Sequence, residues 1–340
     1  MKAAILDTIA APLRIAEWPT PRPAAQEVLV ATRTCGICRT DLHIQDGLAY
    51  IPHLPHILGH EPAGVVAEVG ADVTTLQVGE RVVPHLFVSS RECRFTRTGQ
   101  HAQATHLAGI LGVTMPGAFA EYFCVPARNL LRLPDTVPFD LGGLTSCALI
   151  TAVHALRRAR LQLGDTVLVL GIGGIGLVLV QLLRAAGVRV LAVGRSMTSR
   201  KLALEQGAEE TFPADDSAVS AVERHLGGAD AVDCVFEMVG LSTTMNLAAK
   251  LVRRGGQIVV IGEEPETVPI DTIRIAQREI AIIGSRNGGM NDAEDALRML
   301  ARGVIRPQIA ARFPLDKVNE ALALVRTGGA HGRVIIDVKN

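Results

Sequence analysis

A glycine-rich turn after an apolar segment constrains the fold of this 340-residue chain more than any other feature of its sequence. Residues 166–171, TVLVLG, have the composition of a buried strand, and residues 174–187, GIGLVLVQLLRAAG, that of a helix. The glycines between them have G-x-G-x-x-G spacing, which permits a tight turn, close approach of a pyrophosphate to the backbone, and close packing of helix on strand. An ordinary glycine turn is the alternative. The sequence predicts a dinucleotide site at Gly171, Gly173, Gly174, Ile175 and Gly176.

The pattern around this turn predicts two domains. Apolar strand-like and helical segments alternate after about residue 165, which is typical of a doubly wound parallel sheet of the Rossmann type. The preceding residues form short β-rich segments separated by Pro and Gly. The C-terminal tail reads as a helix and a strand that return to the first domain. We expect a cofactor domain over residues 150–286 and a discontinuous β-rich domain over residues 1–149 and 287–340.

The end of the strand after the glycine turn bears on cofactor choice. NAD sites usually have an acidic residue there, about 20 residues beyond the glycines, which binds the ribose hydroxyls. This chain has Gly194, Arg195 and Ser196 instead, with Arg200 nearby. Glycine leaves room for a 2′-phosphate and arginine can bind it in a bidentate manner. NADP(H) is therefore favoured over NAD(H). Alternatively, Arg195 is solvated and NAD binds without an acidic anchor.

Charge and composition exclude some classes of partner. Lysine plus arginine and aspartate plus glutamate both number 34, so nucleic acid and anionic membranes are not expected partners. No apolar run approaches the roughly 20 residues of a membrane span, and the N-terminus lacks a signal-peptide core. Six cysteines in a chain of this size do not suggest a disulfide framework. We expect a soluble cytoplasmic enzyme.

Three segments that lie far apart in the sequence carry side chains that bind metals. They are TCGICRTDLH at residues 34–43, GHE at residues 59–61, and SCALITAVHAL, which contains Cys147. Two cysteines and one histidine are a known ligand set of catalytic zinc, with the fourth position left open for substrate. Spacing alone would also allow Cys35 and Cys38 to act as a C-x-x-C pair.

The C-R-T-D-L-H, G-H-E and G-x-G-G-x-G elements, in this order and at these separations, resemble the zinc-containing medium-chain alcohol dehydrogenase family over essentially the whole chain. The resemblance implies a GroES-like β-rich catalytic domain beside the Rossmann domain, and a homodimer or homotetramer. It also implies hydride transfer between an alcohol or carbonyl and the nicotinamide. The residues that it assigns are the zinc ligands Cys38, His60 and Cys147, the second-sphere or alternating ligand Glu61, Asp41 to orient His60, and Arg39 on the pyrophosphate.

The same resemblance implies a route for the proton of the alcohol. Zinc lowers the pKa of a bound hydroxyl, so that Thr40 could take the proton and His43 could pass it towards solvent. Thr40 could instead be an ordinary loop hydroxyl and His43 an exposed histidine. Cys35 is expected to be a small buried residue of the preceding strand.

The sequence departs from the family pattern in one lobe. Many members hold a second, structural zinc there with C-x2-C-x2-C-x7-C spacing, and the matching positions here are Ser90, Cys93, Thr96 and Ala104. A closed zinc site needs four ligands, so we predict one catalytic zinc and no structural zinc. The lobe is then held by packing and hydrogen bonds, or is loose. His101 and His106 do not fit the spacing and are expected at the surface.

The substrate is predicted only as a class. We expect an apolar pocket for a small alcohol, aldehyde or ketone, with Leu48, Leu86, Met115 and Ile283 as candidates that could equally be packing residues. A zinc dehydrogenase of polyols or amino alcohols would share every residue named. A zinc-free reductase would lack the Cys38, His60 and Cys147 set. A non-catalytic dinucleotide-binding protein would not need Thr40 and His43.

Overall fold

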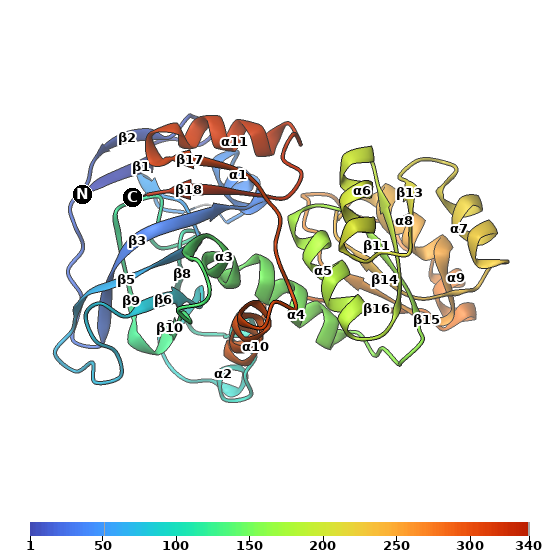
Figure 1. Cartoon of the computed structure of the whole chain (residues 1–340), viewed down its shortest axis with the longest axis horizontal. Coiled ribbons are helices and arrows are strands. Elements are labelled where there is room, and N and C mark those ends of the chain that lie inside the picture. Colours follow the sequence, from blue (N-terminus) through green and yellow to red (C-terminus); the bar gives the residue numbers. More distant parts are fainter. Residues whose placement is uncertain (51, 339–340) are drawn as a thin grey trace. The chain divides into compact units, whose positions relative to one another are not determined.

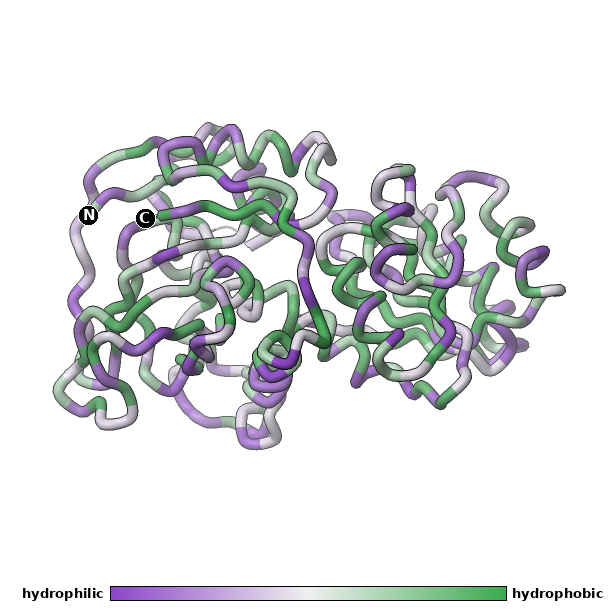
Figure 2. Tube along the Cα trace, in the orientation of Figure 1, coloured by the Kyte–Doolittle hydropathy of each residue, from purple (hydrophilic) through white to green (hydrophobic). Residues whose placement is uncertain are grey.

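The computed structural model describes residues 1–50 and 52–338, which form two units. One unit comprises Met1–Ile150 and Gly288–Asn340, and the other comprises Thr151–Asn287. The boundaries lie one residue beyond those expected from the sequence. Each unit has its own sheet and helices (Figure 1). In Figure 2 the hydrophobic residues follow mainly the inner strands of each unit, and the hydrophilic residues gather on its outer helices and turns.

The discontinuous unit is rich in β-structure. Its strands are β1 (Lys2–Leu6), β2 (Arg14–Glu17), β3 (Glu27–Ile37), β4 (His56–Ile57), β5 (Glu61–Val69), β6 (Arg81–Pro84), β7 (Phe87–Ser89), β8 (Leu107–Ile110), β9 (Tyr122–Pro126), β10 (Leu130–Arg132), β17 (Ile309–Pro314) and β18 (Arg333–Asp337). Its α-helices are α1 (Arg39–Gln45), α2 (Arg94–Arg97), α3 (Phe139–Gly143), the start of α4 (Ala148–Arg158), α10 (Met290–Ala301) and α11 (Val318–Arg326). Its 3-10 helices are η1 (His101–Gln103), η2 (Ala127–Asn129), η3 (Leu144–Ser146) and η4 (Leu315–Lys317).

The central sheet of this unit brings the two ends of the chain together. Its order is β10-β6-β5-β3-β18-β17, and β9 also pairs with β3. Strand β18 runs antiparallel to β3, with Ile336 opposite Cys35, so the C-terminal tail completes the first domain as expected. Smaller sheets are formed by β2-β1-β4 and by β7-β8.

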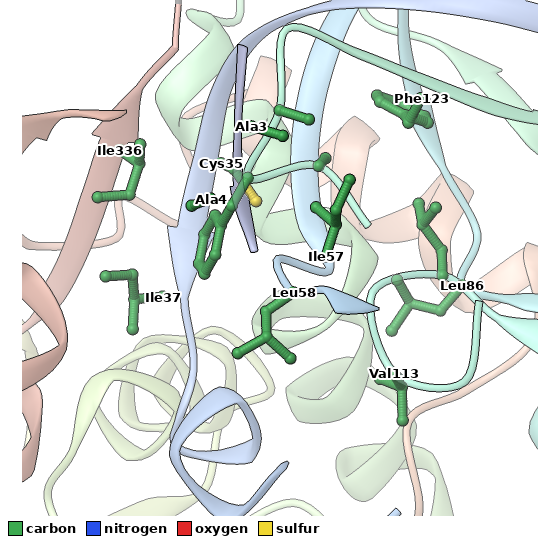
Figure 3. Close-up of a cluster of buried hydrophobic side chains, with 14 of the residues drawn as sticks. Ala3, Ala4, Cys35, Ile37, Ile57, Leu58, Leu86, Val113, Phe123 and Ile336 are labelled. Atoms are coloured by element: carbon green, nitrogen blue, oxygen red, sulfur yellow. The ribbon is translucent and has the colours of Figure 1, made fainter. Parts of the chain in front are cut away.

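A hydrophobic core cluster packs against these strands (Figure 3). Cys35 and Ile336 contribute to it from β3 and β18, and Phe123 contributes from β9. These side chains are almost fully buried because alternate residues of each strand point to the same face of the sheet. The strand ends that carry the candidate site are thus fixed by a packed interior.

The second unit is a six-stranded parallel sheet with the order β13-β12-β11-β14-β15-β16. Its strands are β11 (Thr166–Leu170), β12 (Arg189–Gly194), β13 (Glu210–Pro213), β14 (Val232–Glu237), β15 (Val252–Val260) and β16 (Ala281–Gly284). Its helices, besides most of α4, are α5 (Gly174–Ala185), α6 (Met197–Gln206), α7 (Ala218–Leu226), α8 (Ser242–Leu251) and α9 (Thr272–Arg278). Figure 1 shows α5 and α6 on one side of the sheet and α7, α8 and α9 on the other, which confirms the predicted doubly wound fold.

Within residues 1–50 and 52–338, no single helix is both long and apolar enough to cross a membrane. One helix pair, Phe139–Ser146 with Ala148–Arg158, meets the length and composition test only when its two parts, bent by 49°, are taken together.

Candidate functional site

The first part of the site is built where β3 ends and α1 begins. Cys38 has extended backbone angles and precedes the first residue of α1. Asp41, in the first turn of that helix, accepts a hydrogen bond from the Cys38 backbone N–H through Oδ2 at 2.9 Å. This contact satisfies a backbone donor that the helix itself leaves unpaired. The C-R-T-D sequence therefore fixes the Cys38 sulfur at the start of the helix.

Four side chains from three distant segments meet at this point. Ligand atoms of Cys38, His60, Glu61 and Cys147 all lie within 4.8 Å of one another, and the two sulfurs are 3.9 Å apart. Among the residues that the structure describes, this is the one group of at least three such side chains that could hold a metal ion. Cys35 lies outside the group, in the core cluster, as expected.

The orientation of His60 favours metal binding. Its Nδ1 lies 3.1 Å from Oδ1 of Asp41, and both side chains are buried. The same carboxylate oxygen accepts the Gly59 backbone N–H at 3.2 Å. Because an ionised carboxylate only accepts, the His60 Nδ1–H must donate. Nε2, which has no hydrogen-bond partner within the described chain, is then the nitrogen available to a cation.

The two thiols behave as a coupled pair. A hydrogen bond from the Cys147 thiol, opposed by burial and aided by His60, lowers the pKa of Cys38 well below its usual range. The pKa of Cys147 is raised well above its usual range, because its proton is shared with Cys38 and because the thiol is buried. Burial opposes the charge on His60, but Asp41 and Cys38 together outweigh it and raise the pKa of the imidazole. A divalent cation bound by these side chains would displace their protons.

A buried arginine pairs with Glu61 and was not among the site residues predicted from the sequence. Arg333, the first residue of β18, donates from Nη2 to the Glu61 carboxylate and, at 3.0 Å, to the Ile37 carbonyl. Both charged side chains are buried. The one available signal was an arginine at the start of the apolar segment RVIID, since a buried guanidinium needs an anionic partner.

Gly36 is a second residue that sequence reasoning missed. A Cβ at this position would lie 2.2 Å from Glu61 Oε2 and 2.9 Å from Leu144 Cδ2. The glycine of C-G-I-C therefore leaves the space in which the Glu61 carboxylate sits.

The other residues predicted around the metal lie on α1. Thr40 Oγ1 is 3.7 Å from the Cys38 sulfur, within hydrogen-bonding reach of the thiol. His43 lies one turn further along the same helix and is 9% exposed, so it is not the exposed histidine of the alternative interpretation. Arg39 is the first residue of α1, and its side chain is exposed.

In the other unit, the glycine turn has the geometry that a phosphate site needs. Gly171 has a φ of +109°, which a residue with a side chain rarely adopts, and a Cβ at Gly176 would lie 2.3 Å from the Gly171 oxygen. Gly173 precedes the first residue of α5, and a Cβ there would meet no described atom within 4 Å. Space is thus open at a helix N-terminus, together with the adjoining residues Gly174 and Ile175.

The end of β12 carries the residues predicted to select the cofactor. Gly194 is the last residue of the strand, and a Cβ there would come within 2.8 Å of Ile172 Cδ1. Arg195 is exposed. Ser196 caps α6 by accepting the Ser199 backbone N–H at 3.4 Å, and Arg200 lies in the first turn of that helix.

The lobe around residues 90–106 is held by hydrogen bonds at two of the positions that the structural-zinc spacing would fill with cysteine. Ser90 bonds to the His106 carbonyl through its backbone N–H at 2.9 Å and its hydroxyl at 3.2 Å. Thr96 Oγ1 accepts the Cys93 backbone N–H at 2.9 Å. His101 is half-buried rather than at the surface, because its Nδ1 accepts the Met290 backbone N–H at 3.4 Å and its ring lies 5.3 Å from that of His85.

The four candidate pocket residues differ in their burial and in the unit to which they belong. Leu86 is 4% exposed and belongs to the core cluster (Figure 3), which favours a packing role over the predicted pocket role. Met115 is half-buried against the same cluster, whereas Leu48, beyond α1, is 49% exposed. Ile283 lies in the other unit, on the edge strand β16.

Comparisons with known proteins agree with this geometry. Residues 24–135 match the alcohol dehydrogenase GroES-like domain, and residues 174–302 match the zinc-binding dehydrogenase domain. An alcohol dehydrogenase of Geobacillus stearothermophilus is 34% identical over 99% of this chain and 100% of its own length. The chain belongs to the zinc-dependent medium-chain alcohol dehydrogenase family. It is therefore an NAD(P)-dependent oxidoreductase of alcohols and carbonyl compounds, as the sequence predicted.

Two further relatives show the range of this family. A D-arabinose 1-dehydrogenase (NADP(+)) of Saccharolobus solfataricus is 32% identical over 98% of this chain and 97% of its own length. The crystal structure of a zinc-binding dehydrogenase from Sinorhizobium meliloti 1021 bound to NADP is 31% identical, covers 99% of both chains and superposes with a TM-score of 0.89. Zinc and a nicotinamide cofactor are thus features of the family to which this chain belongs.

Proposed function

We propose that this enzyme interconverts a small alcohol and its aldehyde or ketone with NADP(H), on a single zinc held by Cys38, His60 and Cys147. The observation that carries this proposal is the convergence of two sulfurs and one imidazole nitrogen from distant segments in one buried cluster. Two thiolates and a neutral imidazole are a zinc donor set that leaves a coordination position open. Glu61 lies in the same group and is proposed as the second-sphere or alternating ligand.

The chain's own residues would position and move the proton. Zinc, when bound, supplies a Lewis acid that lowers the pKa of a hydroxyl in the open position. Thr40, whose Oγ1 is 3.7 Å from the Cys38 sulfur, would accept the proton of the alcohol. His43, one helical turn away on the same face of α1, would take it onward. Asp41 would hold the ring of His60 so that Nε2 faces the metal.

The cofactor site is proposed at the glycine turn and at the end of β12. The N-terminus of α5 would bind the pyrophosphate, with Arg39 as an additional cation. A preference for NADP(H) is supported by the missing side chain at Gly194 and by the exposed guanidinium of Arg195. Two of the relatives described above, both named with NADP, are consistent with this preference.

A second candidate substrate class is sugars and other polyols. The D-arabinose dehydrogenase among the relatives supports it, and every proposed zinc ligand would serve both classes equally. A panel of aliphatic alcohols, benzylic alcohols and pentoses, assayed with NADP+ and NAD+, separates the two. A higher kcat/KM for a pentose than for any simple alcohol would favour the second class.

We also propose a cytoplasmic homodimer or homotetramer. All six cysteines are free thiols, which is typical of proteins in a reducing compartment. Strand β16 is an edge of the parallel sheet, and Ile282 on it is 39% exposed, while Ile273 on the neighbouring helix α9 is 68% exposed. An unpaired edge strand with exposed apolar residues is suited to contact with another copy of the chain. Sedimentation or light scattering tests this proposal, and a monomer at micromolar concentration would reject it.

Metal analysis and substitution of Cys38 test the zinc proposal. We expect about one zinc per chain in the wild-type protein and in the matched control Cys35→Ala, because Cys35 lies outside the cluster. Cys38→Ser should lose zinc and turnover while dinucleotide binding, followed by fluorescence titration, survives. Two zinc ions per chain would contradict the single-zinc proposal, and a fully active Cys38→Ser enzyme would remove Cys38 from the ligand set.

A further inference from the structure

A hollow of about 410 Å³ lies in the lobe, and none of the proposed zinc ligands lines it. Its wall is formed by the end of β7, by residues of the lobe, by η2 and by the first residue of α10. Among the lining residues, Ser90 and Thr96 occupy two of the four positions where the family pattern has zinc-binding cysteines. The hollow thus lies in the lobe that departs from the structural-zinc spacing, and its volume is in the range of small-molecule sites.

The charge of the lining residues favours an anion. Arg91 and Arg128 contribute two guanidinium groups and Glu92 one carboxylate, which leaves a net positive charge. Arg128 donates from Nη2 to the Ser89 carbonyl at 2.6 Å, and Arg91 Nη2 contacts the ring of His106 at 2.9 Å. Each contact uses one nitrogen of a group that carries five N–H donors. Both arginines are exposed, and each keeps N–H donors that these contacts do not use.

Two further polar groups line the same wall. His101 accepts the Met290 backbone N–H at Nδ1, so its proton is on Nε2 and that nitrogen is a donor. The Ser89 hydroxyl oxygen is buried and has no hydrogen-bond partner among residues 1–50 and 52–338.

We propose that this hollow binds the phosphate or carboxylate group of a small metabolite. The volume exceeds that of a bare oxyanion, so the anionic group would contact Arg91 and Arg128 while the remainder of the molecule lies against Phe87 and Met290. Such a ligand would connect β7, η2, the lobe and α10. It would stabilise the lobe as the concentration of ligand rises above its Kd.

Binding of inorganic phosphate and of citrate to the zinc-loaded full-length enzyme tests this proposal. Isothermal titration is carried out with the dinucleotide site saturated by NADP+, because that site also binds phosphate, and sodium chloride of equal ionic strength is the control. We expect saturable binding of at least one probe, and the tighter of the two identifies the oxyanion. Arg91→Gln and Arg128→Lys should each weaken it by about tenfold or more, since each loses charge-assisted or bidentate hydrogen bonds.

Arg97→Gln is the matched control, because Arg97 is an exposed arginine of the same lobe that does not line the hollow. It should leave the Kd unchanged. The proposal is overturned if neither probe binds saturably, if chloride reproduces the heat, or if Arg97→Gln weakens binding as much as Arg91→Gln. Thermal unfolding without ligand shows whether a variant has lost the fold rather than the site. If Arg128→Lys has a clearly lower Tm than the wild-type protein, the Kd of Arg91→Gln alone tests whether the hollow binds the anion.

Discussion

Removing the buried arginine beside the proposed zinc ligands should destabilise the β-rich unit strongly. In Arg333→Met, the carboxylate of Glu61 would keep its buried position without its ionic partner, and the Ile37 carbonyl would lose its donor. Removing one partner of a buried ion pair typically costs about 3–5 kcal/mol, and the 6% and 0% exposure of these residues leaves little room for solvent screening. For a unit of about 200 residues, about 2–4 °C of Tm corresponds to each kcal/mol. We expect a decrease of about 6–20 °C.

The single tryptophan makes the assay specific to this unit. Trp18 is the only tryptophan of the chain and packs against the core cluster of the β-rich unit, so its fluorescence follows the unfolding of that unit. Heat and urea unfolding are measured on zinc-free protein, because zinc binding would otherwise contribute to stability. Arg302→Met is the matched control, since Arg302 is exposed in the same unit and its loss should change stability by less than about 0.5 kcal/mol.

A double variant separates the ion pair from simple packing. Glu61→Gln in the Arg333→Met background removes the unpaired charge, so the double variant should be more stable than the sum of the two single losses predicts, by about 2 kcal/mol or more. Strict additivity would refute the reasoning, because it would mean that the two residues do not depend on one another. A loss in Arg333→Met no larger than that of Arg302→Met would refute it equally.

Three further predictions concern the cofactor, pH and the lobe. Gly194→Asp should raise the ratio of kcat/KM with NAD to kcat/KM with NADP by about tenfold or more, because the carboxylate repels the 2′-phosphate. Gly194→Ala adds the same Cβ without the charge and should leave this ratio unchanged. Equal shifts in the two variants would indicate a steric cause. Burial lowers the pKa of His85 from 6.5 to about 4. Between these two pH values the unfolded chain binds a proton that the folded chain does not. The free energy of unfolding should therefore fall by about 3 kcal/mol as pH drops from about 6.5 to about 4. Urea unfolding at several pH values should show a flatter profile for His85→Phe but not for the exposed control His53→Gln. In Gly289→Ala the new Cβ would lie 1.7 Å from the Gly99 oxygen, so the lobe would have to move away from Gly289. Limited proteolysis should then cleave the lobe faster than in the wild-type protein. An unchanged rate would argue that the lobe does not depend on this contact.

The features that sequence predicted well are those whose physics is local. The glycine turn before α5 needs a positive φ at Gly171 and close packing at Gly176, and both requirements are visible in the sequence as glycines at a fixed spacing. The start of α1 is set within four residues, because Asp41 bonds to the Cys38 backbone N–H. The alternation of strand and helix after residue 165 likewise predicted the parallel sheet.

Contacts between distant segments could not be predicted in this way. Arg333 and Glu61 are separated by 272 positions, and the sequence around each residue does not indicate which residue it pairs with. Leu86 was a pocket candidate because it lies near a motif, but the packing of the core cluster encloses it. The hydrogen bonds of Ser90 and Thr96 depend on the way the lobe folds back on itself, which a missing cysteine does not reveal.

The charges around the proposed zinc explain why the missed arginine belongs to the site. Zinc with the thiolates of Cys38 and Cys147 and a neutral His60 is electrically neutral, so the cluster can be buried at little electrostatic cost. The carboxylate of Glu61 within the same group would add a negative charge, and burial raises its pKa above the usual range although Arg333 opposes the shift. Arg333 supplies the compensating positive charge through its pair with Glu61 and stays outside the cluster of ligand atoms. The pair with Arg333 therefore offsets the charge of an ionised Glu61 next to the metal position, so that this carboxylate does not make the centre anionic and the Lewis acidity on which the proposed chemistry depends is preserved.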